Sequence, residues 1–362
     1  MTIHSKTSAG LDGVVAAATA LSHVDGERGE LIIGGARVGD LAGRVPFEAL
    51  TGRLWSLAGS ATVAETEARR LLGVARARTF ERLPAILSAA EGLPVAAGFR
   101  AGVAALGPVS GLPDEAVLVG AMPVIATALV RRSRGEAPVA PHPALGHAAD
   151  TLRMLRGLPG GETEARALDA YLVTASDHGM NASTFTARVV ASTQADLFMA
   201  VTAAYCALTG PLHGGAPGPV LDMLDAIGTR GNIAAWVDAA LARKERLMGF
   251  GHRVYRVRDP RADVLREAVS WLGRTRRDLG LAAAVEAHAR EALRRAKPDR
   301  PLDTNVEFYT AILLEALEIP REAFTPIFAV ARAAGWTAHA IEQQRTGRLL
   351  RPDSVYLGEV PG

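Results

Sequence analysis

The chain has 362 residues, too many for one minimal domain, and 49% of them are hydrophobic, which allows a sizeable core. Lysine and arginine number 40 and aspartate and glutamate 38, so the net charge of +2 gives no reason to expect nucleic acid as a partner. The single cysteine, Cys206, excludes an internal disulfide and a cysteine-based metal cluster, and its apolar neighbours predict a buried, inert thiol.

No segment predicts export or membrane insertion. The first residues, Met1–Lys6, lack the apolar core of a signal peptide. The most apolar stretch, Ala116–Val130, is interrupted by Pro123 and is shorter than the roughly 20 residues that a membrane helix needs. We therefore expect a cytoplasmic protein that does not enter the membrane.

The predicted elements are almost all helices. A short strand over Glu30–Ile33 ends in a glycine turn at Gly34 and Gly35, and an extended tail follows residue 348. Between them, apolar residues three and four positions apart indicate helices. Their ranges are 46–57, 63–74, 79–87, 115–132, 145–155, 162–175, 181–191, 195–208, 218–227, 233–245, 262–272, 281–295, 302–317 and 324–343. The sequence predicts a mainly α fold with a small N-terminal strand element.

Two histidines lie in glycine-rich segments. His213 is followed by two glycines, and His252 follows Gly251. Glycine lets backbone or a ligand approach closely, and an imidazole can give or take a proton at neutral pH. Charged residues follow at Asp259–Arg261 and at Glu307. We interpret these separated segments as parts of one active site.

Taken in order, these segments resemble the citrate synthase family. The matching stretches are residues 10–16, 177–188, 210–217, 248–256, 305–309, 324–336 and 348–352. A single glycine–histidine pair would mean little, whereas this many motifs in the same order form a specific signal. The resemblance implies a citrate synthase-like helical fold of two domains. Residues 1–213 and 320–362 would form the large domain and residues 214–319 the small one, with the substrates in the cleft between them.

The family resemblance also implies a reaction. Citrate synthases join the methyl carbon of acetyl-CoA to the ketone of oxaloacetate and then hydrolyse the thioester to citrate and CoA. Removal of the weakly acidic methyl proton needs a carboxylate base and a hydrogen-bond donor at the enolate oxygen. By resemblance, Glu307 is the base, His213 donates to the thioester oxygen and His252 is the acid at the oxaloacetate carbonyl.

The binding residues are implied in the same way. Oxaloacetate is a dicarboxylate, and His178, Arg261, Arg332 and Arg351 match its ligands in the family, with Arg351 reaching the partner's site in a homodimer. For coenzyme A, Arg256 would meet the phosphates, and the backbone at Leu247, Gly249 and Gly251 would lie against the adenine. No metal and no cofactor beyond the CoA thioester is expected. Two residues inside or beside these motifs, Trp336 and His339, are expected to pack without touching substrate.

Glu307 departs from the family pattern, in which the base is usually aspartate. Glutamate reaches one methylene further, and a displacement of ~1 Å can cost about 100-fold in rate. This leaves open a catalytically silent relative that binds CoA or dicarboxylates. A second alternative is 2-methylcitrate synthase, which uses propionyl-CoA, because one methylene shifts acyl preference by only ~1–3 kcal/mol.

Overall fold

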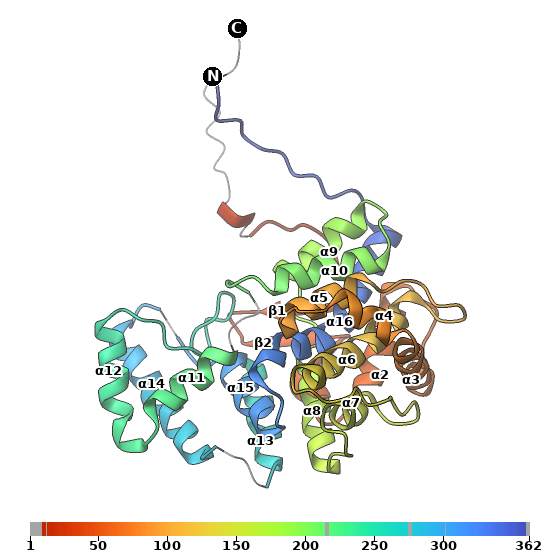
Figure 1. Ribbon diagram of the computed structural model, residues 1–362. Coiled ribbons are helices and arrows are strands. Elements are labelled where there is room, and N and C mark those ends of the chain that lie inside the picture. The colour runs from red at the N-terminus through yellow and green to blue at the C-terminus, as the bar shows by residue number, and fades with distance from the viewer. Residues whose placement is uncertain (1–8, 12, 214–216, 274–276, 301, 360–362) are drawn as a thin grey trace.

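The computed structural model describes residues 9–11, 13–213, 217–273, 277–300 and 302–359 (Figure 1). The predictions for Met1–Lys6, and for the domain boundary where it falls on residues 214–216, lie outside the described residues. In the described part helices dominate, and a single three-stranded antiparallel sheet has the order β1-β2-β3. Val24 of β1 pairs with Leu31 of β2, and Ile32 of β2 pairs with Arg37 of β3. The predicted mainly α fold with a small strand element is confirmed.

The strand predicted at Glu30–Ile33 is β2, and its neighbours β1 (Ser22–Asp25) and β3 (Ala36–Arg37) were not predicted. Both are short and partly exposed, so neither shows the apolar alternation of a half-buried strand. Only β2 places two side chains, Leu31 and Ile33, fully in the core.

The larger group of helices packs around α6 and α16 at the right of Figure 1. Most of its members match predicted ranges, whereas α1 and α5 were not predicted. The bounds are α1 Val38–Leu41, α2 Phe47–Ala58, α3 Glu65–Glu81, α4 Leu83–Ala89, α5 Val95–Ala104, α6 Asp114–Ser133, α7 His147–Arg156, α8 Glu162–Ala175, α9 Ala182–Ser192, α10 Leu197–Leu208 and α16 Phe324–Thr346.

Helix α6 shows why an apolar stretch needs tertiary context. It runs through Pro123 for 20 residues, and the helix predicted over 115–132 is confirmed. By length and composition it could cross a membrane, yet 83% of its most apolar window is buried inside the fold. Helices α3, α5, α7 and α16 pack against it. We therefore describe α6 as the central core helix.

The second group of helices lies at the left of Figure 1 and follows His213 in the chain. Its members are α11 Pro217–Ile227, α12 Ile233–Ala242, α13 Pro260–Trp271, α14 Leu279–Ala296 and α15 Val306–Ala316. Helices α13 and α15 both pack against α8 of the first group. These contacts bring α13, α15, α8 and α16 together, and the candidate site lies among them.

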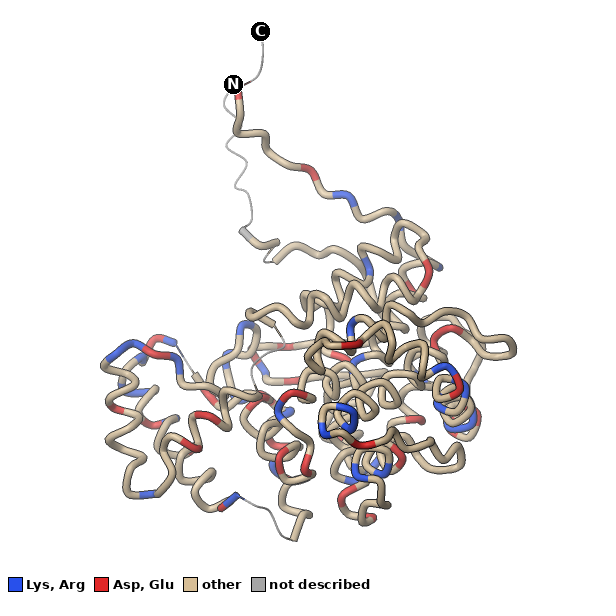
Figure 2. Tube along the Cα trace, viewed as in Figure 1, with Lys and Arg blue, Asp and Glu red and all other residues tan. Residues whose placement is uncertain are grey.

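Side-chain caps fix where the helices of the site begin. Asn181, Asp259 and Asn305 stand immediately before α9, α13 and α15, and each accepts hydrogen bonds from backbone N–H groups of the first turn. These N–H groups have no partner within a helix, so the caps select the starting residue. Figure 2 shows acidic and basic residues interspersed over the described part of the chain.

Both ends of the described chain project from the body at the top of Figure 1. They carry exposed apolar side chains, including Val15 (88% exposed) and Leu357 (93%). Cys206 on α10 is also exposed, so the prediction of a buried thiol was wrong. Met199, two turns earlier on the same helix, is 59% exposed. Helix α10 therefore has apolar side chains both on its buried face and on its exposed face.

Candidate functional site

Two segments distant in the chain are clamped together at the centre of the site. Phe250 and Thr304 form a β-bridge. The Gly251 N–H donates to the Asp303 carbonyl at 2.7 Å, and the Asn305 N–H donates to the Gly249 carbonyl at 2.9 Å. The Asn305 side-chain amide closes the clamp by donating to the Gly251 carbonyl at 2.7 Å. The segment that carries His252 is thereby fixed against the segment that leads to Glu307.

This clamp requires glycine at two positions. Gly249 and Gly251 have φ values of 85° and 79°, in the left-handed region that L side chains rarely adopt. A Cβ on Gly249 would lie 2.9 Å from Phe308, and one on Gly251 would lie 2.7 Å from Leu302. The glycines of this motif are therefore needed for chain conformation and for close packing.

Asp259 connects the starts of α13 and α15. Its carboxylate accepts the Arg261 N–H at 3.0 Å, and it holds the Arg261 guanidinium at 3.0 Å (Nε) and 2.8 Å (Nη2). Its Oδ2 also accepts the Val306 N–H at 3.1 Å. Burial disfavours the charged guanidinium, but Asp259, together with Tyr255 and Glu307, outweighs this, and the pKa of Arg261 is raised. The sequence carries a signal for this role, because an aspartate directly before a proline is typical of a helix start, although we predicted no individual role for Asp259.

The proton of His252 is placed by the backbone. The N–H groups of Val254 and Tyr255 point at Nδ1 from 3.0 and 3.2 Å. Burial, followed by the charge of Arg261, lowers the pKa of His252 to about 4, so the ring is neutral and carries one N–H. Since Nδ1 accepts, Nε2 bears the proton. The Arg261 Nη2 lies 3.3 Å from Nε2, which places the arginine cation directly beside this edge of the ring.

His178 stands beside His252. Their rings are 5.5 Å apart in an edge-on arrangement, and the His178 Nε2 lies 3.1 Å from the Tyr255 hydroxyl. Burial is the main reason that the pKa of His178 falls well below 6.5, and the charge of Arg261 adds to the effect. His178 is therefore neutral as well, and a ligand here meets a neutral ring beside a fixed cation.

His213 carries its proton on the other ring nitrogen. The Ser183 N–H donates to Nε2 at 3.3 Å, and the Ser183 hydroxyl lies 2.9 Å from the same nitrogen. Trp336 fixes that hydroxyl by donating to it at 3.1 Å. Burial, followed by the charge of Arg332, lowers the pKa of His213 to about 4. The neutral ring therefore has its proton on Nδ1, which leaves Nδ1–H as the free donor.

Ser183 and Trp336 were not predicted to act near the site. Trp336 is buried in the core as expected, at 0% exposure, yet its indole N–H orients the serine that sets the tautomer of His213. His339 is buried behind the site, where it contacts Asp177 and Arg188, in agreement with a packing role. No sequence signal beyond the shared motif pointed to Ser183.

Arg332 lies on α16 with 2% exposure. Its Nε donates to the Ala175 carbonyl at the end of α8 at 2.6 Å, and its guanidinium stacks on Phe328 at 4.8 Å. Burial lowers the pKa of Arg332 to about 10, which leaves it charged at neutral pH. The remaining guanidinium nitrogens make no hydrogen bond with the described residues, as expected of an arginine kept for an anion.

Glu307 is in the first turn of α15, where its N–H donates to the Asn305 side chain at 3.0 Å. Its carboxylate oxygen Oε2 is buried and has no hydrogen-bond partner among the described residues. Burial raises the pKa of Glu307 to about 7, while Arg261 and Arg332 act in the opposite direction and Asp259 adds to the rise. A carboxyl group whose pKa lies close to neutral pH, and whose oxygen has no partner among the described residues, is suited to proton transfer.

The structure brings six of the predicted residues into one cluster: His178, His213, His252, Arg261, Glu307 and Arg332. Arg351 does not join it, because it lies exposed on the projecting C-terminal tail. The cluster comes from five segments, and its charges are close enough to shift one another's pKa values.

A cavity of about 460 Å³ adjoins the cluster at His252. Of the predicted CoA-binding residues, Leu247, Gly251 and Arg256 line it, while Gly249 lies behind the wall against Phe308. Further cations at the cavity are Arg246, Arg253, Lys297 and Arg300, against a single acid, Glu245. This excess of positive charge suits a polyphosphate.

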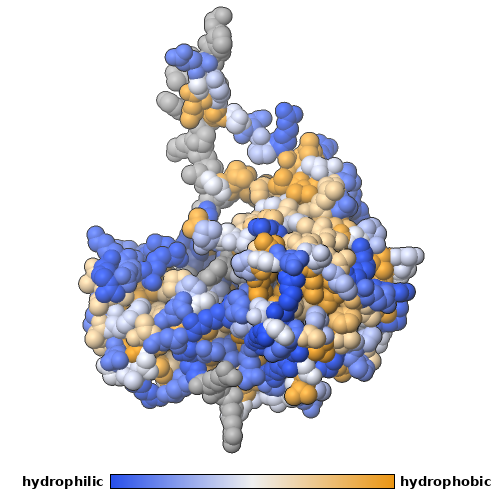
Figure 3. Space-filling view, viewed as in Figure 1, coloured by the Kyte–Doolittle hydropathy of each residue, from blue (hydrophilic) through white to orange (hydrophobic). Residues whose placement is uncertain are grey.

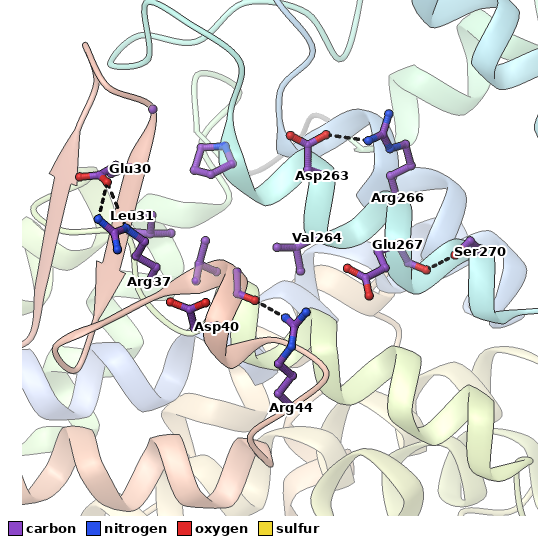
Figure 4. A pocket seen from close by; sticks show the side chains of 14 residues that line it. Glu30, Leu31, Arg37, Asp40, Arg44, Asp263, Val264, Arg266, Glu267 and Ser270 are labelled. Atoms are coloured by element: carbon purple, nitrogen blue, oxygen red, sulfur yellow. Dashed lines mark hydrogen bonds and ion pairs between the residues drawn. The ribbon is translucent and has the colours of Figure 1, made fainter.

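A larger cavity, of about 790 Å³, lies on the far side of α13 between β2, β3 and α1 (Figure 4). None of the predicted site residues lines it. Its charged side chains are largely paired within each wall, as in Arg37 with Glu30 and Arg266 with Asp263. The charges therefore cancel locally, and the cavity separates α13 from the N-terminal sheet without offering a built ligand site.

The chain is similar to known proteins over almost its whole length. The family model "Citrate synthase, C-terminal domain" matches residues 10–353. The chain is 39% identical to the putative citrate synthase 2 of Mycobacterium tuberculosis, over 97% of this chain and 93% of that protein. It is 38% identical to the citrate synthase of Haloferax volcanii, over 97% and 95% of the two chains. It is also 36% identical to the 2-methylcitrate synthase of M. tuberculosis, over 96% and 90%.

Among solved structures, the chain is similar to the citrate synthase of Thermoplasma acidophilum, determined as a ternary complex with carboxymethyl coenzyme A and oxaloacetate. The TM-score is 0.86 at 27% sequence identity, over 98% of this chain and 97% of that one. The similarity therefore extends over both groups of helices and over the cluster between them.

Proposed function

The chain belongs to the citrate synthase family of condensing enzymes, and from this membership we propose how its site residues join acetyl-CoA to oxaloacetate. The observation that carries the proposal is the carboxylate oxygen Oε2 of Glu307, which is buried and has no partner among the described residues, in a cluster with two arginines and three neutral histidines. Each group has a protonation state that suits one step of the condensation.

The first step is removal of a methyl proton from the acyl group. Glu307 takes the proton, and the Nδ1–H of His213 donates to the thioester oxygen as it gains enolate character. Because the pKa of Glu307 is about 7, an appreciable fraction of the base is ionised at neutral pH, and it accepts a proton more readily than an ordinary carboxylate.

The second step is attack of the enolate carbon on the oxaloacetate ketone. Arg261 and Arg332 bind the two carboxylates, with His178 beside them. The Nε2–H of His252, with the Arg261 guanidinium beside it, would donate to the ketone oxygen as that oxygen gains negative charge. Hydrolysis of the thioester then releases citrate and CoA. The phosphates of CoA would occupy the cationic cavity of Arg246, Arg253 and Arg256.

We place the boundary between a large and a small domain along this site. The large domain would hold residues 1–213 and 320–362, and the small domain residues 214–319. On this division, Arg332 and His213 belong to the large domain, and His252, Arg261 and Glu307 to the small one. Oxaloacetate bound between Arg261 and Arg332 would draw the two together and exclude water during condensation.

The projecting ends support a homodimer. Both termini carry exposed apolar side chains, as does the outer face of α10, and Figure 3 shows hydrophobic residues along the projecting segments and on the upper body. Apolar surface of this extent normally faces a partner. The tail is anchored where the Leu350 N–H donates to the Ser192 hydroxyl at 3.0 Å, which leaves Arg351 directed beyond its own body.

Arg351 is expected to serve the site of the other subunit. We predict that Arg351→Ala and Glu307→Gln dimers are each poorly active, and that co-refolding them in equal amounts restores about a quarter of wild-type turnover, because half the dimers then contain one intact site. The measurement is thiol release after mixing, with sedimentation velocity to confirm the dimer. No restoration, despite mixed dimers seen by mass, would place Arg351 in its own subunit's site or in none.

The overall reaction is tested by release of free thiol from acyl-CoA in the presence of oxaloacetate. We expect a higher kcat/KM with acetyl-CoA than with propionyl-CoA. A propionyl preference would make the enzyme a 2-methylcitrate synthase, and the 36% identity to one such enzyme motivates that comparison. If both compounds bind by calorimetry but neither yields thiol, the chain is a silent binding protein.

A further inference from the structure

One buried tyrosine near the site has a hydroxyl without a partner. Tyr171, on α8, is 1% exposed, and its hydroxyl is buried and makes no hydrogen bond with the described residues. The other three buried tyrosines all use theirs. Tyr205 donates to the Ala96 carbonyl at 3.0 Å, Tyr255 contacts His178 at 3.1 Å, and Tyr309 donates to Glu286 at 2.5 Å. A buried phenol normally finds a partner, so the exception needs an explanation.

The place of Tyr171 suggests what the partner is. Helix α8 packs against α13, α15 and α16, the three helices that carry Arg261, Glu307 and Arg332. Tyr171 is one turn before Ala175, whose carbonyl accepts the Arg332 Nε at 2.6 Å. The hydroxyl therefore belongs to the face of α8 that borders the site.

A second buried polar atom without a partner among the described residues belongs to α15, the helix that packs against α8. The Oε2 of Glu307 is the buried carboxylate oxygen that lacks a donor. Burial raises the pKa of Tyr171 far above its usual value, and the charge of Glu307 raises it further, which shows that the two groups influence each other. The phenol stays protonated at every physiological pH, so it can act as a donor and the carboxylate as its acceptor.

We propose that Tyr171 is a positioning residue for Glu307. The Tyr171 hydroxyl donates a hydrogen bond to the Glu307 carboxylate when the substrates bring α15 toward α8. This inference rests on the proposed role of Glu307 as the base. In the domain division given above, Tyr171 is in the large domain and Glu307 in the small one, so closure forms the bond and both groups stay unpaired before it. The bond fixes the extra rotatable methylene of glutamate and holds the carboxylate toward the acyl methyl group.

The test is Tyr171→Phe, which removes one oxygen and keeps the ring. We expect kcat to fall about ten- to a hundredfold, as for loss of a hydrogen bond to a charged group. The KM values for oxaloacetate and acetyl-CoA should stay within about twofold of wild type. Without its donor the carboxylate is harder to ionise, so the acid limb of kcat against pH moves to higher pH and the deficit shrinks in alkaline solution. The matched control is Tyr205→Phe, a buried tyrosine of α10 whose hydroxyl is bonded away from the site.

Stability provides a second reading that does not depend on activity. Tyr171→Phe removes a hydroxyl that is unpaired in the free protein, so its Tm should equal or exceed that of wild type. Tyr205→Phe leaves the Ala96 carbonyl without its donor and should have a lower Tm. A double-mutant cycle with Glu307→Asp adds a coupling test, because the effect of Tyr171→Phe should diminish when the shorter carboxylate is beyond reach.

The outcomes separate the two proposals. If Glu307→Gln abolishes turnover while Tyr171→Phe keeps the kcat and pH profile of wild type, the base stands and the role of Tyr171 is refuted. A change confined to either KM would also refute it, since the hydroxyl would then act on substrate. If wild-type protein releases no thiol from either acyl-CoA, the proposed function fails, and the role of Tyr171 fails with it.

Discussion

Glu307→Gln is expected to lower kcat by about 10²- to 10⁴-fold, the usual contribution of a general base. Glutamine has nearly the same shape and cannot accept the methyl proton. The affinity for oxaloacetate should change little, because Arg261 and Arg332 supply its fixed charges and remain in place. Turnover is measured by thiol release, and oxaloacetate binding by calorimetry.

The pH dependence of wild-type kcat/KM gives an independent check on the same group. The base must be ionised, and burial raises the pKa of Glu307 to about 7. Activity should therefore be full above that pH and should be lost as the pH falls through about 7. His213 and His252 have pKa values of about 4, so both stay neutral across this range and contribute no second limb there. An acid limb near 4.5 instead would show that the carboxylate is solvated and not buried.

The control for Glu307→Gln is Glu267→Gln, an exposed carboxylate on the face of α13 that borders the larger cavity. It removes the same charge from α13, the helix that carries Arg261, and should leave kcat unchanged. Glu307→Asp then tests the departure from the family pattern. A large loss would show that the site is built around the longer side chain, whereas improved turnover would show that glutamate handicaps this enzyme.

His213→Ala is expected to lower kcat by about 10²- to 10³-fold, as for loss of one donor to a developing oxyanion. The ring acts on the thioester oxygen through Nδ1–H, so oxaloacetate affinity should be largely kept. The proton is on Nδ1 because the Ser183 N–H occupies Nε2. Steady-state kinetics with both substrates, together with calorimetry for oxaloacetate, separate the two effects.

His142→Ala is the matched control for His213→Ala, since His142 is exposed and lies in the loop before α7. It should behave as wild type. A loss of oxaloacetate affinity comparable to the loss of kcat in His213→Ala would contradict the assignment to the acyl substrate. It would place His213 among the oxaloacetate ligands beside His178.

The sequence by itself determined the helices and the types of residue in the site. Helix α8 was predicted with its bounds, Glu162–Ala175, because its apolar period is regular. Asn181, Asp259 and Asn305 mark helix starts because a short polar side chain satisfies the first N–H groups locally. The glycines at 249 and 251 could be recognised because a local backbone conformation demands them. Each of these features depends on neighbours within a few residues.

Tertiary structure alone decided the features that depend on distant parts of the chain. The exposure of Cys206 and the burial of α6 through Pro123 follow from which helix faces find partners. The proton of His213 is fixed by Ser183, 30 residues away, and the ionisation of Glu307 by the removal of water around it. The hydroxyl of Tyr171 has no partner among the described residues, and only the packing of α8 against α15 brings its helix beside the one that carries Glu307. Tautomers and pKa values depend on the solvent and charges around a group, and folding sets these by bringing remote residues into contact.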